Sequence, residues 1–155
     1  MIGWIVGFTD GEGCFSVSIF KNSTTRLGWQ VFPEFSVTQG EKSLPALHKF
    51  REFFKCGSLV RNARKDNHRE DLHRYVVRSV ADLQKHIIPF FHRHALRTAK
   101  QRDFLIFADL VARIARQEHL TQRGMISIAK RVATMNRRKP SNFLSSSETI
   151  RRTSC

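Results

Sequence analysis

The stretch that decides the fold is the first one, M1-I-G-W-I-V-G-F-T-D-G-E-G13. Its apolar residues predict a short helix over about 2–13 that ends in acids and glycines. Gly3, Gly7 and Gly11 recur every four residues, so they share one face of this helix. Glycine inside a helix costs about 0.5–1 kcal/mol relative to alanine, so a glycine stripe indicates that another backbone approaches closely there. Gly11 and Gly13 are also expected to end the helix, because glycine adopts positive φ without penalty.

Two acids, Asp10 and Glu12, lie at the end of this predicted helix. The C-terminus of a helix carries partial negative charge, so carboxylates there are unfavourable unless a cation joins them. A divalent metal held by Glu12 and a terminal carbonyl would be such a cation, since hard cations take oxygen ligands. The residues alone leave a second interpretation open, namely an ordinary buried helix followed by a glycine turn with solvated acids.

The composition indicates a basic globular protein. The 155 residues include 27 Lys and Arg against 13 Asp and Glu, a net charge of +14, and 41% of them are hydrophobic. This length predicts one domain over residues 1–155. The charge favours nucleic acid as partner over an anionic membrane, and a merely solubilising basic surface is the alternative. The three cysteines show no disulfide or zinc spacing, the seven histidines give no convincing metal-ligand set, and no segment predicts a membrane span or signal peptide.

Hydrophobic periodicity predicts four strands and several further helices after the first helix. The strands are expected at 14–21, 29–39, 58–63 and 72–79. The helices are expected at 43–54, 80–91, 98–116 and 121–135, followed by a basic loop at 136–142. Ser43 is the expected cap of its helix, and Pro89 is expected to bend or end the next one. The order αββαββα with further helices predicts an α+β fold whose sheet has one face uncovered.

The uncovered face would carry hydroxyl, amide, guanidinium and apolar side chains, because alternate strand residues point away from the core. Such a mixture can read base edges in a major groove, and a basic cluster after the last long helix would bind phosphates. The predicted DNA-contacting residues are Ser16, Ser18, Phe20, Asn22, Gln30, Phe32, Glu34, Ser36, Arg61, Ala63, Arg74, Val76, Arg137, Arg138 and Lys139. A solvated polar face is the alternative, and exposed Phe20 and Phe32 argue against it.

The stretch I5-V-G-F-T-D-G-E-G13 resembles the LAGLIDADG motif. The resemblance continues through C14-F-S-V-S-I19 and F35-S-V-T-Q39 and covers the chain from residue 2 to about 152. It is to the single-motif homing endonucleases encoded in group I introns of organelles. It implies the LAGLIDADG fold, a curved four-stranded antiparallel sheet saddle backed by helices. It also implies hydrolysis of both strands of a long pseudo-palindromic double-stranded DNA site, leaving 3′ overhangs that start intron homing in a chloroplast or mitochondrion.

The resemblance also implies the residues of the active site. Glu12 would be the catalytic, metal-binding acid, with the backbone carbonyl of Gly11 beside it, and Mg²⁺ would be the cofactor, with Mn²⁺ as a substitute. Gln39 resembles a glutamine that orients water, although simple strand-end hydrogen bonding is its alternative. Lys100 lies in a region that supplies a peripheral lysine, and there the family often has two adjacent lysines. Ser43 stands where similar enzymes can carry an arginine, so this chain departs from the pattern at that position.

One motif in this sequence supplies one acid, whereas cutting two strands requires two acids close together. The expected solution is a homodimer in which two copies of the first helix pack about a two-fold axis. The predicted interface residues are Gly3, Gly7, Phe8 and Gly11. Two alternatives stay open on the same fold: a maturase that binds intron RNA, and a DNA-binding protein that does not cleave. No membrane partner is expected.

Overall fold

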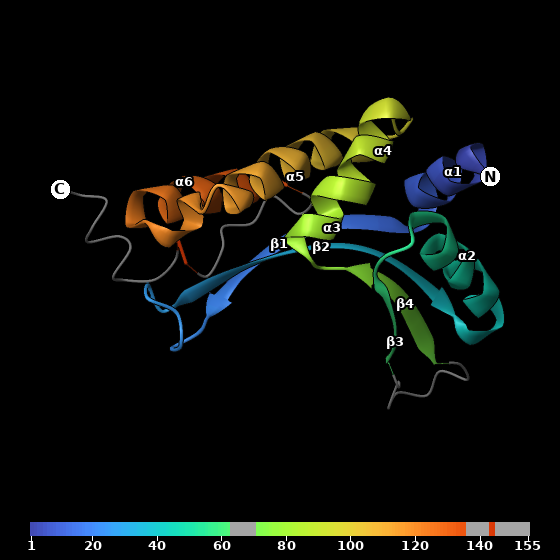
Figure 1. The fold of residues 1–155 in the computed structure, drawn as a ribbon, viewed down its shortest axis with the longest axis horizontal. Helices are drawn as coiled ribbons and strands as arrows, with labels where there is room; N and C mark the ends of the chain where they lie inside the picture. The colour runs from blue at the N-terminus through green and yellow to red at the C-terminus, as the bar shows by residue number, and fades with distance from the viewer. Residues whose placement is uncertain (63–70, 136–142, 145–155) are drawn as a thin grey trace. The chain divides into compact units, whose positions relative to one another are not determined.

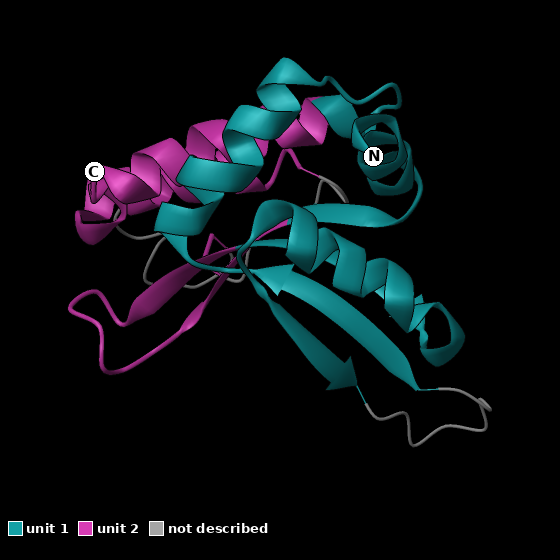
Figure 2. Cartoon of the chain, turned by 45° about the vertical axis from the view of Figure 1, so that its right-hand side comes forward, with its two compact units in different colours: residues 1–15, 34–101 teal, residues 16–33, 102–155 magenta. Residues whose placement is uncertain are grey.

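The computed structural model describes residues 1–62, 71–135 and 143–144. The chain divides into two compact units (Figure 2). Unit 1 comprises residues 1–15 and 34–101, and unit 2 comprises residues 16–33 and 102–155. No helix within the described ranges combines the length and the apolar character needed to cross a membrane.

Four strands form one sheet in the order β1-β2-β4-β3 (Figure 1). They are β1 (Gly13–Lys21), β2 (Trp29–Gly40), β3 (Ser58–Asn62) and β4 (Leu72–Val77). β4 pairs antiparallel with both β2 and β3. The helices are α1 (Ile2–Glu12), α2 (Leu44–Phe54), α3 (Val80–Asp82), α4 (Ile88–Arg93), α5 (Lys100–Ala115) and α6 (Gln122–Val132), with short turns η1 (Glu41–Ser43), η2 (Leu83–Ile87) and η3 (Glu118–Leu120). The predicted α+β fold is confirmed.

Two predicted helix signals act differently from expectation. Ser43 occupies the N-cap of α2, but its side chain makes no capping hydrogen bond, because the turn η1 leads directly into the helix. Pro89 lies in the first turn of α4, after the π-helical turn η2. Proline is tolerated there because the first turn of a helix needs no intrahelical donor. Pro89 therefore does not end the helical segment, which continues to Arg93.

Unit 1 is built on an aromatic core. The ring of Phe35 in β2 lies 5.0 Å from Phe15, 5.6 Å from Phe91 and 6.2 Å from Tyr75, between centroids. All four rings are at most 1% exposed. Offset and edge-to-face aromatic pairs contribute beyond the area they bury, so this cluster anchors the start of β1 and the helix α4 to the sheet.

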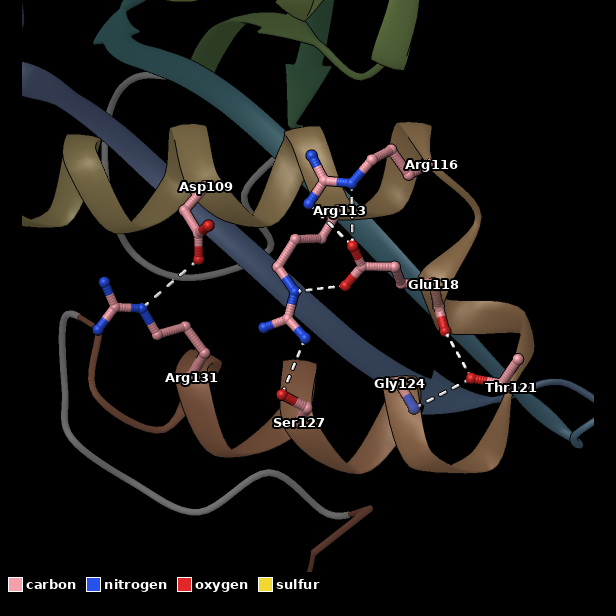
Figure 3. Close-up of polar contacts among 8 residues, drawn as sticks. All are labelled: Asp109, Arg113, Arg116, Glu118, Thr121, Gly124, Ser127 and Arg131. Carbon is pink, nitrogen blue, oxygen red and sulfur yellow. Dashed lines mark hydrogen bonds and ion pairs between the residues drawn. The ribbon is translucent and has the colours of Figure 1, made fainter.

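Unit 2 contains the α5–α6 hairpin, whose polar contacts are drawn in Figure 3. The carboxylate of Glu118 accepts hydrogen bonds from Nε of Arg113 at 2.7 Å and Nε of Arg116 at 3.0 Å. Arg113 also donates through Nη2 to Oγ of Ser127 at 2.8 Å. These bonds from two guanidinium groups lower the pKa of Glu118. The apolar stripe predicted for α5 is confirmed, since Phe104, Phe107, Leu110, Val111 and Ile114 are buried.

Two glycines adopt positive φ in the described residues, and they are not the ones predicted. They are Gly28 at +72° and Gly57 at +79°, whereas Gly13 has φ of −75° at the end of α1. Gly13 is required for space rather than for φ, because an added Cβ would lie 2.6 Å from Cγ2 of Thr9. The helix ends at Gly13 as predicted, but neither Gly11 nor Gly13 has the positive φ that was the expected reason.

Gly57→Ala should strongly destabilise the chain, whereas Gly28→Ala should have a smaller effect. At both positions the left-handed backbone costs an alanine about 1–2 kcal/mol. Only at Gly57 would the new Cβ also meet atoms, 2.7 Å from the carbonyl oxygen of Val76, and such overpacking costs a further 1–3 kcal/mol or so. Urea unfolding of both variants measures the difference. If the two variants lose the same free energy of unfolding, β4 moves away from the added Cβ at no cost.

Candidate functional site

The end of α1 is held by a lysine from the start of α5. Nζ of Lys100 donates hydrogen bonds to the carbonyl oxygens of Thr9 at 2.8 Å and Asp10 at 2.9 Å. This ammonium group supplies the cation that a helix C-terminus favours, and α1 has no basic residue of its own in its last turn. The sequence pattern predicted the need for a cation here. The family resemblance predicted Lys100 near the active site, but it did not show that Lys100 binds the helix end.

Asp10 ties the same helix end to the segment that precedes α5. Its carboxylate accepts hydrogen bonds from the backbone N–H of Arg97 at 2.7 Å and of Thr98 at 3.2 Å, and from the Thr98 hydroxyl at 2.8 Å. Partial burial raises the pKa of Asp10, but these hydrogen bonds and the charge of Lys100 outweigh burial and leave the pKa below its ordinary value. Asp10 thus has a structural role, which separates it from Glu12.

Asp10→Asn should lower the free energy of unfolding by about 1 kcal/mol, a modest figure because the hydrogen bonds are solvent-exposed. The folded chain lowers the pKa of Asp10 below 3.8. Its contribution is therefore complete above pH 3.8 and is lost as pH falls through the lowered pKa. Denaturant unfolding at pH 7 and pH 3 should show a difference between wild type and variant that shrinks in acid. A difference that does not change with pH would contradict this role.

Glu12, the predicted catalytic acid, lies exposed at the last position of α1. Its carboxylate makes no hydrogen bond or ion pair with any other residue in the described ranges, although its charge acts on Lys100. Partial burial is the main reason that the pKa of Lys100 is lowered, and the charges of Asp10, Cys14 and Glu12 oppose that shift. The structure thus brings Glu12 and Lys100 to the same end of α1.

The donor set at this helix end fits a hard divalent cation that is also bound by groups from outside the chain. Glu12 offers a carboxylate and the exposed Gly11 a backbone carbonyl. No group of three or more His, Cys, Asp or Glu side chains in the described residues could hold a metal by itself. Magnesium sites often use one or two carboxylates together with substrate phosphates. A single chain therefore supplies only part of such a site.

Gln39, the other predicted catalytic residue, lies near the end of β2. Its cross-strand neighbour in β4 is His73, and its side chain is half-buried. No hydrogen bond or ion pair joins Gln39 to Glu12 or Lys100 within the described residues, so its catalytic role stays a prediction. Nε2 of His73 is buried and has no hydrogen-bond partner among the described atoms. The search for metal ligands in the sequence did not single out this histidine.

In unit 2 the alternation predicted for β1 is present. Val17 and Ile19 are each 7% exposed, whereas Ser18 and Phe20 are exposed and Ser16 is half-buried. Two pairs of predicted DNA-contacting residues also meet across the hairpin. Nδ2 of Asn22 donates to Oε1 of Gln30 at 2.7 Å, and the rings of Phe20 and Phe32 lie 6.2 Å apart. These two contacts join polar and aromatic side chains of the hairpin, and their contact with DNA remains a prediction.

In unit 1 the predicted face needs correction. Arg61 was placed beside Arg74, but in the β3–β4 register Arg61 is opposite His73 and Val60 is opposite Arg74. Directly opposed residues share a face, so the predicted placement of Arg61 is wrong by one residue. The reason is that β3 contributes Ser58, Val60 and Asn62 to that face, a register that its sequence pattern does not reveal.

Exposure also differs from expectation on this face. Glu34, Ser36 and Val76 are only 8%, 3% and 3% exposed, so they do not present the open surface expected of them. Neighbouring side chains on β4 cover the two polar residues, since Arg74 bonds to both. The predicted contacts Ala63, Arg137, Arg138 and Lys139 lie outside the described residues.

One face of α1 is uncovered by the residues that the structure describes. Of its eleven residues only Ile5 and Thr9 are buried, and the apolar Ile2 is 47% exposed. A Cβ added to Gly3, Gly7 or Gly11 would meet no described atom within 4 Å. The fourth predicted interface residue, Phe8, packs within unit 1 against Trp4 at 5.0 Å and Phe50 at 5.6 Å. The glycine stripe therefore has space for another backbone.

Comparison with known proteins gives consistent matches. The family model described as LAGLIDADG endonuclease matches residues 5–111. "Probable intron-encoded endonuclease 2" of Neurospora crassa is 31% identical over 133 residues, which is 86% of this chain but only 28% of that protein.

Two solved structures share the fold. The homing endonuclease I-TnaI is 35% identical with a TM-score of 0.80, over 99% of this chain and 95% of that chain. I-SmaMI bound to cleaved DNA is 34% identical with a TM-score of 0.85, over 94% of this chain and 47% of that chain. I-SmaMI has also been solved on an uncleaved DNA target in the presence of calcium ions, with a TM-score of 0.83 and 34% identity over 94% of this chain and 48% of that one.

Proposed function

Because this chain belongs to the LAGLIDADG endonuclease family, we propose that it is a homing endonuclease that binds double-stranded DNA and hydrolyses a phosphodiester bond in each strand. The observation that carries the proposal is the end of α1, where Glu12 is exposed and the Lys100 ammonium group binds the carbonyl of Asp10. The net charge of +14 supports a polyanionic substrate. The relation to I-SmaMI, solved on cleaved DNA, supports the same substrate. Residues 1–155 would act as one endonuclease domain.

In this proposal Glu12 and the carbonyl of Gly11 would hold Mg²⁺, with Mn²⁺ able to replace it. Bound there, a divalent cation would stabilise the charge that develops on the phosphate oxygens. Lys100 would keep the carbonyls of Thr9 and Asp10 occupied, so that α1 ends in a fixed position. Gln39 would orient water near the scissile phosphate. The calcium ions present with I-SmaMI on uncleaved DNA support a divalent cation in this family.

The active enzyme would be a homodimer that recognises a long pseudo-palindromic site and leaves 3′ overhangs. The uncovered glycine face of α1 supports this assembly, since two such helices could pack closely and bring both Glu12 residues together.

The gene would lie in a mobile intron of an organelle, a chloroplast or a mitochondrion, and DNA cleavage would start intron homing. The intron-encoded relative in Neurospora crassa supports the intron origin. Binding of intron RNA as a maturase, or DNA binding without cleavage, would be the alternative function of the same surface.

Cleavage of a randomised DNA duplex library tests the proposal, with magnesium in one arm and calcium in the other. We expect a pseudo-palindromic site that is cut with 3′ overhangs in magnesium and only bound in calcium. Tight, sequence-specific binding without cutting in either ion would contradict the enzyme and favour a DNA-binding protein. Preference for structured intron RNA over any duplex would favour a maturase.

A further inference from the structure

A buried carboxylate lies on the sheet face of unit 1 and is bound on both of its oxygens. Glu34 in β2 is 8% exposed. Its Oε1 accepts from Nη2 of Arg74, and its Oε2 accepts from Nε of Arg78 at 2.7 Å. A carboxylate occupied in this way does not offer its oxygens to the exocyclic amine of a cytosine, the base contact that an exposed glutamate could make.

The register explains why these groups meet. Ser36 lies opposite Val76, so the residues two positions away on each strand, Glu34 on β2 and Arg74 on β4, share this face. Arg78 follows the same alternation beyond the end of β4. The same Nη2 of Arg74 also donates to Oγ of Ser36 at 3.1 Å. The side chains of Arg74 and Arg78 remain 32% and 44% exposed, whereas that of Glu34 is 11% exposed.

We propose that Glu34 is a positioning residue for DNA recognition, which orients Arg74 and Arg78, and that it does not itself read a base. The inference rests on the proposed function, since it concerns how the same surface selects its DNA. One negative charge between two positive charges leaves this group with a net charge of +1. The shared carboxylate therefore fixes the two guanidinium groups in direction, which suits recognition better than two mobile side chains.

The bonds of Arg74 define what it can offer to DNA. Both of its hydrogen bonds to the protein use Nη2, and Nε and Nη1 make none to the described residues. A guanidinium group donates two parallel hydrogen bonds either through Nε and Nη2 or through Nη1 and Nη2. Because Nη2 of Arg74 already donates to Glu34 and Ser36, Arg74 cannot donate such a pair to the O6 and N7 of guanine. Glu34 would thus restrict Arg74 to single hydrogen bonds from Nε and Nη1. Loss of Glu34 would free Nη2 of Arg74 for such a paired contact and change the base preference.

The test compares the binding specificity of wild type, Glu34→Gln, Arg74→Gln and the double variant on the site selected by the wild type. Binding is measured in calcium over a range of salt concentrations, against every single base-pair substitution of that site. We expect Glu34→Gln to bind non-target DNA several-fold more tightly. The slope of the logarithm of its binding constant against the logarithm of the salt concentration should be steeper by up to about one. This variant should lose discrimination at the base pairs where Arg74→Gln loses it, and the double variant should lose no more.

Glu118→Gln is the matched control. Glu118 also joins two arginines, Arg113 and Arg116, and its replacement removes the same single charge (Figure 3). This control should leave the base-pair profile unchanged. Thermal unfolding verifies that each variant is folded at the assay temperature. If Glu34→Gln does not fold, Arg78→Gln replaces it. Loss of Arg78 removes one of the two arginines that hold the Glu34 carboxylate, so discrimination at the base pairs that depend on Arg74 should change.

Three results would overturn the inference. Glu34→Gln, or Arg78→Gln in its place, could leave the Arg74-dependent base pairs unchanged. Glu34→Gln could instead relax a base pair that Arg74→Gln leaves intact, which would make Glu34 a direct base contact. Finally, the wild-type chain could show no sequence-specific binding to any duplex, and this result alone would also overturn the proposed function.

Discussion

Glu12→Gln should abolish DNA cleavage and leave DNA binding intact. The substitution keeps the size of the side chain and its place at the end of α1, but it removes the only charged donor of the proposed metal site. We expect the rate to fall by more than about 100-fold, because even changes in the groups that surround metal ligands cost roughly 10–100-fold. Single-turnover cleavage in magnesium measures the loss, and equilibrium binding in calcium measures the affinity.

The control for this experiment is Glu52→Gln, which makes the same substitution at an exposed position of α2. It changes the net charge equally and should cut at the wild-type rate. Unfolding curves of the two variants should coincide with that of the wild type, because the Glu12 side chain makes no hydrogen bond or ion pair within the described part of the chain. Normal cleavage by Glu12→Gln would remove Glu12 from the active site.

Much of the fold follows from local patterns in the sequence. Strand β1 alternates so regularly that Phe15, Val17 and Ile19 could be assigned to the core, and each is buried. The stripe of α5 was equally clear. These assignments succeed because burial of one face requires a fixed period, and the period is visible in a single segment.

The relations between segments were harder to predict. The register of β3 against β4 places Val60, rather than Arg61, opposite Arg74. Strand β3 has few apolar residues to mark its inner face, and a shift of one residue exchanges the two faces of a strand. The burial of Glu34 depends on Arg78, which lies just beyond β4. The predicted strand 72–79 already contained Arg78, and the alternation of Arg74 and Val76 would have placed it on the same face.

In the candidate site, too, the sequence predicts local positions but not the contacts between distant segments. The motif fixed Glu12 at the end of a helix, and that position is local. The partners of Asp10 lie about ninety residues away, at Arg97 and Thr98. No sequence period connects these positions, so only the folded chain reveals which groups the Asp10 carboxylate binds. Lys100 was predicted from the family resemblance, whereas its bonds to the carbonyls of α1 come from the structure.

Gly7→Leu should separate the proposed dimer without unfolding the chain. Gly7 is exposed, and a Cβ added there meets no atom of the described residues within 4 Å. In a two-fold interface the same leucine would intrude twice. At about 1–3 kcal/mol for each overpacked site, dimerisation would weaken roughly thirtyfold to ten-thousandfold. Sedimentation of the free protein and of its complex with DNA measures the change, and cleavage of both strands should be lost with it.

Ala115→Leu provides the matched control for Gly7→Leu, because it adds comparable bulk at an exposed position of α5. Its association and cleavage should equal those of the wild type. Thermal unfolding at low protein concentration separates a weakened interface from a damaged fold, since Gly7→Leu should leave the stability of the isolated chain unchanged or slightly raised, leucine being the better helix former. A Gly7→Leu variant that still associates and cuts both strands would show that the glycine face of α1 is not the interface, and the two Glu12 residues would then have to meet by another route.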